Sequence, residues 1–164
     1  LLCACGPLAV VNAAEVVDFR VEERRFDADL FRPPVAPRGT VVLAHGFLRD
    51  RQSLDALARE LADRGALVLV PDLPFLADPS ANAAALSTIV IDIRGGRFGP
   101  VPARTVLIGF SAGGLASLLA AARTPGITGW IGLDPVDRAG EGLHAAARVT
   151  HCAGSMRRRS NAAE

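Results

Sequence analysis

Strand-like apolar runs alternate with helix-like segments through the middle of this 164-residue chain, and this alternation constrains the fold more than any other feature. Four runs are nearly continuously apolar, as strands buried on both faces are: 40–44, 66–70, 104–110 and 127–133. The segments between them carry apolar side chains at helical spacing: 54–61, 78–95 and 112–123. Such alternation predicts the α/β class, with a doubly wound, mostly parallel sheet and helices on both faces.

Local signals place the ends of these elements. Gly65 follows the first helix, where a left-handed residue is favoured. Asp78 and Pro79 are typical of an N-cap and a first helical position. Before the first parallel strand, apolar and polar residues alternate over 16–27, which predicts one half-buried strand, antiparallel at the sheet edge. A proline-rich turn over 32–38 is expected to follow it.

The two ends of the chain differ from the core predicted for 15–149. Residues 1–14 form an apolar run that ends in small residues, typical of a signal-peptide remnant without its basic start. This predicts a secreted or periplasmic protein. A buried first strand and a lipid-modified Cys5 are the alternatives. Residues 150–164 lose strand and helix periodicity, and we expect an irregular basic tail or a segment that has left the frame of the fold.

Composition excludes several classes of protein. Lys and Arg number 18 against 17 acidic residues, and the one basic run is 157–159, so no nucleic-acid footprint is expected. No apolar stretch reaches the roughly 18–20 residues of a membrane span. Cys3, Cys5 and Cys152 are too few for a disulfide framework, and no Cys and His spacing indicates a metal site. We expect a soluble domain once any leader is removed.

Gly109-Phe110-Ser111-Ala112-Gly113 is a G-x-S-x-G pentapeptide between a predicted buried strand and a predicted helix. This setting is typical of a nucleophile elbow, in which a sharp turn exposes the serine hydroxyl. The flanking glycines are needed because a turn this tight leaves no room for side chains nearby. The helix beginning at Ala112 also directs its N-terminal amides toward a developing oxyanion. The alternative is a glycine-rich turn with an incidental serine.

With this motif in place, the chain resembles the α/β-hydrolase family from about Phe31 to Val136. The resemblance implies an oxyanion hole formed by the backbone amides of Ala112 and Phe47, the latter after His45-Gly46. It also implies that His45 shapes the loop rather than acting as the general base.

The segment 131–137 reads Ile-Gly-Leu-Asp-Pro-Val-Asp and resembles the corresponding segment of chlorophyllases and their bacterial relatives. That resemblance implies Asp134 as the acid of the triad, with Asp137 as the second candidate. The alternative is an ordinary turn, because Asp-Pro pairs commonly open turns.

In the family the catalytic histidine follows the eighth strand. Only about thirty residues follow Leu133 here, too few for two further strand and helix units, so we expect C-terminal strands to be missing from a truncated or frame-shifted hydrolase. His144 and His151 are the remaining candidates for the base, although each is more typical of a surface histidine. The strand ending at Leu133 is expected to leave an open sheet edge.

These observations predict a serine hydrolase that cleaves small-molecule or lipid-like carboxylic esters through Ser111, with no metal or organic cofactor. The alternative is a catalytically inactive remnant that binds an apolar ligand or a partner chain. Asp72 and the apolar residues after it, to Leu76, are read as a turn, with a pocket lining as the alternative. Trp130 and Phe110 are expected to fill the core. The oligomeric state is left open.

Overall fold

The computed structural model describes residues 13–101, 103–137, 140–149, 151–153 and 157–158. The described chain begins with a hairpin of β1 (Glu15–Val21) and β2 (Arg24–Phe31), which pair antiparallel. The prediction of one strand over 16–27 is therefore wrong, because the chain reverses at Glu22, whose φ is 52°. The predicted position of β1 at the sheet edge is confirmed.

The central sheet has seven strands in the order β1-β2-β4-β3-β5-β6-β8. From β4 to β8 the neighbours are parallel, while β2 joins β4 antiparallel. The mostly parallel sheet is confirmed, and its parallel strands are β3 (Gly39–Ala44), β4 (Ala66–Pro71), β5 (Thr105–Phe110), β6 (Gly129–Leu133) and β8 (Cys152–Ala153).

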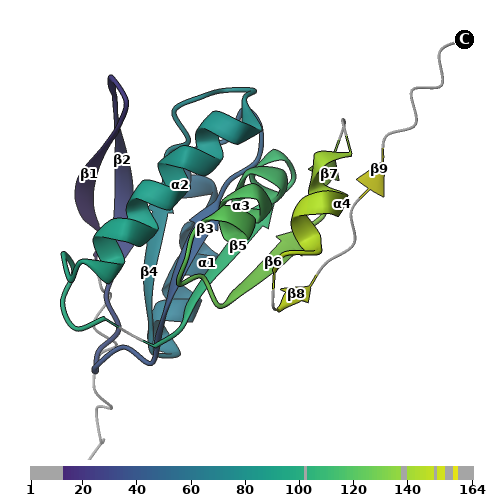
Figure 1. The fold of residues 1–164 in the computed structure, drawn as a ribbon. Helices are drawn as coiled ribbons and strands as arrows, with labels where there is room; N and C mark the ends of the chain where they lie inside the picture. Colours follow the sequence, from purple (N-terminus) through teal and green to yellow (C-terminus); the bar gives the residue numbers. More distant parts are fainter. Residues whose placement is uncertain (1–12, 102, 138–139, 150, 154–156, 159–164) are drawn as a thin grey trace, which may run out of the picture.

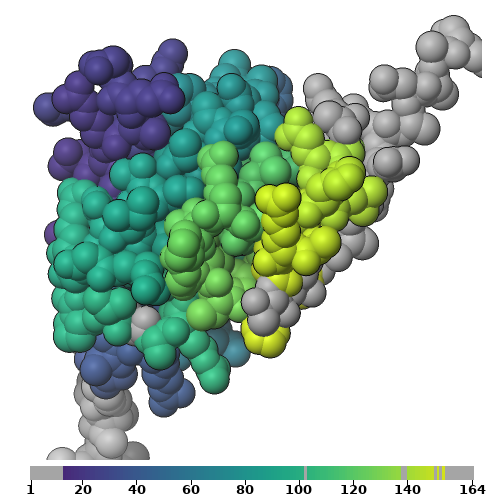
Figure 2. All heavy atoms as spheres, in the orientation of Figure 1, coloured from purple at the N-terminus to yellow at the C-terminus, as the bar shows by residue number. Residues whose placement is uncertain are grey.

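Helices cover both faces of this sheet, as predicted. Figure 1 shows α2, α3 and α4 on the near face and α1 behind the strands, and in Figure 2 the three near helices form one continuous surface. A 3-10 turn, η1, leads into α1. The bounds are η1 (Arg51–Leu54), α1 (Asp55–Asp63), α2 (Pro79–Arg94), α3 (Ala112–Arg123) and α4 (Glu141–Ala146).

The core lies on both faces of the sheet because successive strand residues point to opposite sides. Val42 packs with the α2 and α3 cluster, whereas its neighbour Leu43 packs with α1. Trp130 is buried, as expected. Phe110 is 41% exposed, so its predicted place in the core is wrong. It ends β5 on the α1 face, and α1 packs over β4 and β2, farther along the sheet.

The predicted element ends agree with the structure. Gly65, just past α1, has a φ of 96°. The Asp78 side chain accepts a hydrogen bond from the Ala81 amide at 2.9 Å, so it caps α2 as predicted. The predicted proline-rich turn over 32–38 is also present as a bend between β2 and β3.

Beyond β6 the chain contains more regular structure than expected. β7 (Val136–Asp137) pairs with β9 (Arg157–Arg158), and β8 pairs with β6. The Trp130 amide donates to the His151 carbonyl at 2.8 Å, so the edge of β6 is partly paired rather than open. None of the described helices is long and apolar enough to span a bilayer. The predicted leader falls largely within residues 1–12, outside the described part.

Candidate active site

Ser111 occupies the turn between β5 and α3 with φ 52° and ψ −118°, a strained conformation for a residue with a side chain. Hydrogen bonds from two directions hold it there. Its amide donates to the Leu133 carbonyl at 3.0 Å, and its carbonyl accepts from the amides of Gly114 at 3.0 Å and Val136 at 3.2 Å. The end of β6 and the start of β7 therefore maintain the strained turn.

The glycines of the pentapeptide are required by close backbone approach. A Cβ at Gly109 would overlap the hydroxyl of Ser117 and the backbone of Gly113. A Cβ at Gly113 would overlap the carbonyl oxygens of Ala44 and His45. These contacts give a physical reason for both glycines, since the strand and the helix on either side of Ser111 meet without intervening side chains.

The loop after β3 lies directly beside Ser111. A Cβ placed on Gly46 would be 3.3 Å from the Ser111 Cβ. The Arg49 amide donates to the Gly46 carbonyl at 3.2 Å, which closes a turn containing Leu48 at φ 56°. Phe47, within this turn, lines the same cavity as Ser111 and Ala112. Among the described residues, the Phe47 and Ala112 amides have no hydrogen-bond acceptor, so both are available to a ligand.

His45 is buried, and backbone groups occupy both of its ring nitrogens. The Leu73 amide donates to Nε2 at 3.0 Å. Nδ1 must then carry the proton, and it donates to the Gly46 carbonyl at 2.9 Å. This arrangement agrees with the predicted loop-shaping role of His45 and leaves it no free nitrogen with which to accept a proton from Ser111.

The cavity containing Ser111 has a volume of about 650 Å³. Its apolar wall comes from the loop after β3 and the segment after β4, with further residues from α3 and β7. The apolar lining residues are Phe47, Leu48, Leu73, Leu76, Ala77, Pro79, Ala112, Leu115 and Val136. Arg49 and Glu141 add one charge of each sign, and both are exposed. Part of the segment 72–76, for which a pocket lining was the alternative prediction, does line this cavity, through Leu73 and Leu76. Leu115, Arg49 and Glu141 belong to no motif that could have marked them in the sequence.

The two acid candidates lie in different environments. Asp134 directly follows Leu133, whose carbonyl binds the Ser111 amide, and its side chain is exposed. Asp137 is 2% exposed, and its two carboxylate oxygens accept from the amides of Gly140 at 2.8 Å and Gly142 at 3.0 Å. Asp137 therefore organises the turn into α4, while Asp134 stays at the end of β6 beside the serine.

The two base candidates lie away from the cavity wall. His144 is an exposed residue of α4, and His151 is an exposed residue just before β8. Of the three histidines, all of which the structure describes, only His45 lines the Ser111 cavity. The described geometry does not bring a histidine with a free nitrogen to Ser111.

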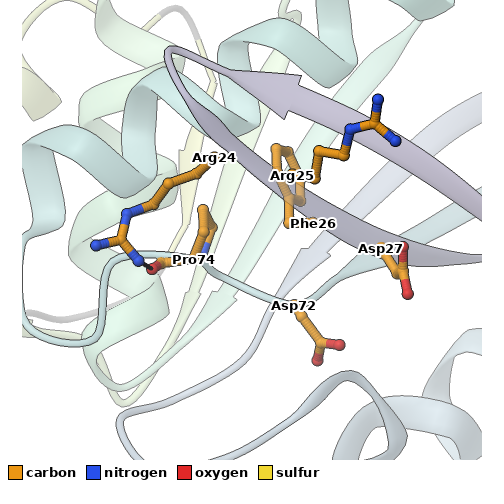
Figure 3. Close-up of a pocket in the computed structure, with 6 residues that line it drawn as sticks. All are labelled: Arg24, Arg25, Phe26, Asp27, Asp72 and Pro74. Carbon is orange, nitrogen blue, oxygen red and sulfur yellow. Dashed lines mark hydrogen bonds between the residues drawn. The ribbon is translucent and has the colours of Figure 1, made fainter.

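A second hollow, of about 480 Å³, lies near the end of β4 (Figure 3). Two of its charged side chains, those of Arg24 and Asp72, already have partners. The Arg24 guanidinium donates to the Pro74 carbonyl at 3.5 Å and lies over the Phe75 ring, while the Asp72 carboxylate binds Arg51. Asp72 thus lines this hollow and not the Ser111 cavity. Within the described residues, no cluster of three or more His, Cys, Asp or Glu side chains is placed to hold a metal ion.

Comparison with known proteins agrees with the fold. A sequence profile described as the alpha/beta hydrolase family matches residues 41–163, which is most of the chain. The chain therefore belongs to the α/β-hydrolase family. A search of curated protein sequences found no match.

Solved structures of hydrolases share the fold at low sequence identity. A dienelactone hydrolase from Anabaena variabilis has a TM-score of 0.69 and 18% identity, over 90% of this chain and 86% of that one. An esterase from Pyrococcus furiosus has a TM-score of 0.66 and 17% identity, over 74% of this chain and 51% of that one. Esterase 2 from Thermogutta terrifontis has a TM-score of 0.65 and 19% identity, over 84% and 62%. The chain thus spans between half and two thirds of the length of these two esterases.

Proposed function

We propose that this chain is a serine hydrolase that cleaves carboxylic esters through an acyl-enzyme on Ser111. The observation that carries the proposal is the strained Ser111, which lines a cavity together with the two unpaired amides of Phe47 and Ala112. A serine beside two free amide donors is the arrangement that acyl transfer requires.

In the proposed reaction the Ser111 Oγ forms a bond to the ester carbonyl carbon while its proton passes to a base. The amides of Phe47 and Ala112 donate to the oxyanion that develops, helped by the positive end of the α3 dipole. Collapse of this intermediate releases the alcohol, and water then hydrolyses the acyl-enzyme. Loss of one such donor typically costs about 10²–10³ in rate.

We assign the acid of the triad to Asp134 rather than to Asp137. Asp134 directly follows Leu133, whose carbonyl binds the Ser111 amide, whereas Asp137 is buried and holds the turn into α4. His144 and His151 remain the candidates for the base within this chain. Either would need to approach Ser111 when substrate binds, because neither lines the cavity.

The cavity lining supports an ester with an apolar acyl group. Leucine, alanine, proline, phenylalanine and valine residues form its apolar wall, and the charged residues Arg49 and Glu141 are exposed. The chlorophyllase-like resemblance of 131–137 also favours an apolar ester, one with a bulky partner. Two of the solved relatives are named as esterases, which is consistent with this substrate class.

A second candidate function is a catalytically inactive domain that binds an apolar ligand or a partner chain. One observation favours it: His45 is the histidine that lines the cavity, and both of its nitrogens are bonded to the backbone. A triad that lacks its base retains only the weak catalysis of binding and the oxyanion hole.

Hydrolysis of a short-chain chromogenic ester by the wild type and by Ser111→Ala separates these functions. We expect turnover by the wild type and a fall of at least about 10³-fold in kcat for the variant, because the nucleophile is removed. The organophosphate paraoxon is a second probe, since it phosphorylates esterase 2 of Thermogutta terrifontis. Mass spectrometry should find the phosphoryl adduct on the Ser111 peptide.

Ser80→Ala is the matched control, since Ser80 is an exposed serine of α2 outside the cavity. It should keep both turnover and labelling. A folded wild type with neither activity would reject the hydrolase and leave the binding function. Turnover that survives in Ser111→Ala would reject Ser111 as the nucleophile.

A further inference from the structure

The loop that carries the Phe47 amide is tied at both ends to one short segment after β4. At its start, the His45 Nε2 accepts from the Leu73 amide at 3.0 Å. At its end, the Arg51 amide donates to Asp72 Oδ1 at 3.0 Å, and the Arg51 guanidinium binds Asp72 Oδ2. Two adjacent residues, Asp72 and Leu73, therefore hold both ends of the loop.

Asp72 is itself anchored to the sheet. Its amide donates to the Asp27 carbonyl of β2 at 2.9 Å, which continues the pairing of β2 with β4. Figure 3 shows its carboxylate directed away from Arg24 and Arg25, the two arginines that line the same hollow. The Asp72 side chain is thus available to Arg51.

Arg51 also connects the loop to β2. Its Nε donates to Asp29 Oδ1 at 2.9 Å, and the side chains of Arg51 and Asp29 are only 17% and 8% exposed. Burial on its own lowers the pKa of Arg51, but the hydrogen bond to Asp29 and the charges of Asp72 and Asp29 outweigh it. The pKa of Arg51 is therefore raised above its ordinary value, and the guanidinium stays charged.

The residues between the two anchors have few other constraints. Phe47, Leu48 and Arg49 are all exposed, and the turn is closed by the 3.2 Å hydrogen bond from the Arg49 amide to Gly46. A partly buried ion pair is weak evidence for added stability, because desolvation offsets much of the attraction. Its position at the end of an exposed loop indicates a role in holding that loop.

We propose that Arg51 and Asp72 are positioning residues, which hold the Phe47 amide where it can donate to the oxyanion beside Ser111. This rests on the proposed function. The planar Arg51 guanidinium is suited to the task because it reaches two carboxylates at once, that of Asp29 in β2 and that of Asp72 just after β4. A loop freed at this end would move the Phe47 donor relative to Ser111 and leave the cavity wall from Leu73 to Pro79 in place.

Asp72→Asn tests the proposal with little change in shape. It keeps an oxygen for the Arg51 amide but removes the charge that binds the guanidinium. We expect kcat for the chromogenic ester to fall about 10- to 100-fold with KM changed less than about twofold, because a displaced donor weakens transition-state binding more than substrate binding. Arg51→Lys keeps the positive charge but loses the planar guanidinium that binds two carboxylates. It should also lower kcat while leaving KM nearly unchanged.

Amide hydrogen exchange by NMR supplies a readout that does not depend on turnover. In Asp72→Asn the Arg49 amide should exchange about tenfold faster, since its turn loses an anchor, while amides of α2 stay unchanged. Arg64→Gln is the matched control because it breaks an exposed ion pair with Glu60 on α1, away from the loop. It should alter neither kcat nor the exchange of Arg49.

The outcomes separate this proposal from the proposed function. An active wild type whose kcat is unchanged in both Asp72→Asn and Arg51→Lys overturns the positioning role, whatever the exchange rates. A wild type without Ser111-dependent turnover rejects the hydrolase. The exchange rate of Arg49 then decides whether Asp72 holds the loop, and an unchanged rate overturns that as well.

Discussion

At the scale of the residue, glycine at position 113 lets helix α3 pack against the end of β3. The Ala44 and His45 carbonyl oxygens occupy the space that a side chain there would need. Both groups are backbone and cannot rotate away. The nucleophile turn and the loop with Phe47 meet at this contact, so a change at Gly113 affects both parts of the candidate site.

Gly113→Ala should lower the free energy of unfolding by about 3 kcal/mol, because overpacking against fixed backbone forces the helix and the strand apart. Gly39→Ala is the matched control, since a Cβ on Gly39 would meet its nearest atom, the Arg104 carbonyl oxygen, at 3.4 Å. Urea denaturation of both variants measures the difference. Equal losses would contradict the packing argument.

Individual residues differ in how far the sequence could predict them. Ser111 was predictable because its motif sets up a local strand, turn and helix. The exposure of Phe110 was not, since it depends on where α1 packs. The ion pairs of Arg51 with Asp29 and Asp72 were not predictable either. Arg51 is 22 residues from Asp29 and 21 residues from Asp72, and these separations give no sequence signal.

At the scale of the element, α2 begins where its own residues specify. Asp78 accepts from the Ala81 amide at 2.9 Å, and Pro79 follows as the first helical residue. The hairpin of β1 and β2 lacked such a signal. Its turn at Glu22 has none of the glycine or asparagine typical of tight hairpins, so the alternating pattern by itself predicts one continuous strand.

Asp78→Ala should destabilise the protein by about 0.5–2 kcal/mol, because the first turn of α2 loses its side-chain acceptor. Asp78→Asn retains an acceptor oxygen and should stay close to the wild type. Thermal unfolding followed by circular dichroism compares the three proteins. If the asparagine variant loses as much as the alanine variant, the negative charge matters and the cap does not.

At the scale of the whole molecule, the two faces of the sheet are covered unequally near β6. Leu107 of β5 faces α2 and α3 and is fully buried. Ile131 of β6 points to the opposite face and is 36% exposed. The position of the helices, and not the hydrophobicity of the strands, therefore sets how much each strand side chain contributes to the free energy of unfolding.

Leu107→Ala should lower the free energy of unfolding by about 2–5 kcal/mol, as large-to-small substitutions in a fully buried core do. Ile131→Ala should cost less than half as much, because Ile131 is already partly in water. Denaturant titration of both variants tests this. Similar losses would show that the α1 face near β6 is as well packed as the α2 and α3 face.

The sequence by itself determined the parallel strands from β3 to β6, the helices between them and the serine turn, because propensity, capping and apolar periodicity act over a few residues. The tertiary structure decided which of these segments meet. It placed the loop of Phe47 beside Ser111, bound both ends of that loop to the segment after β4, and engaged Asp137 with the turn into α4. Those contacts join residues distant in the chain, and they follow from the order of strands in the sheet and from how the helices pack.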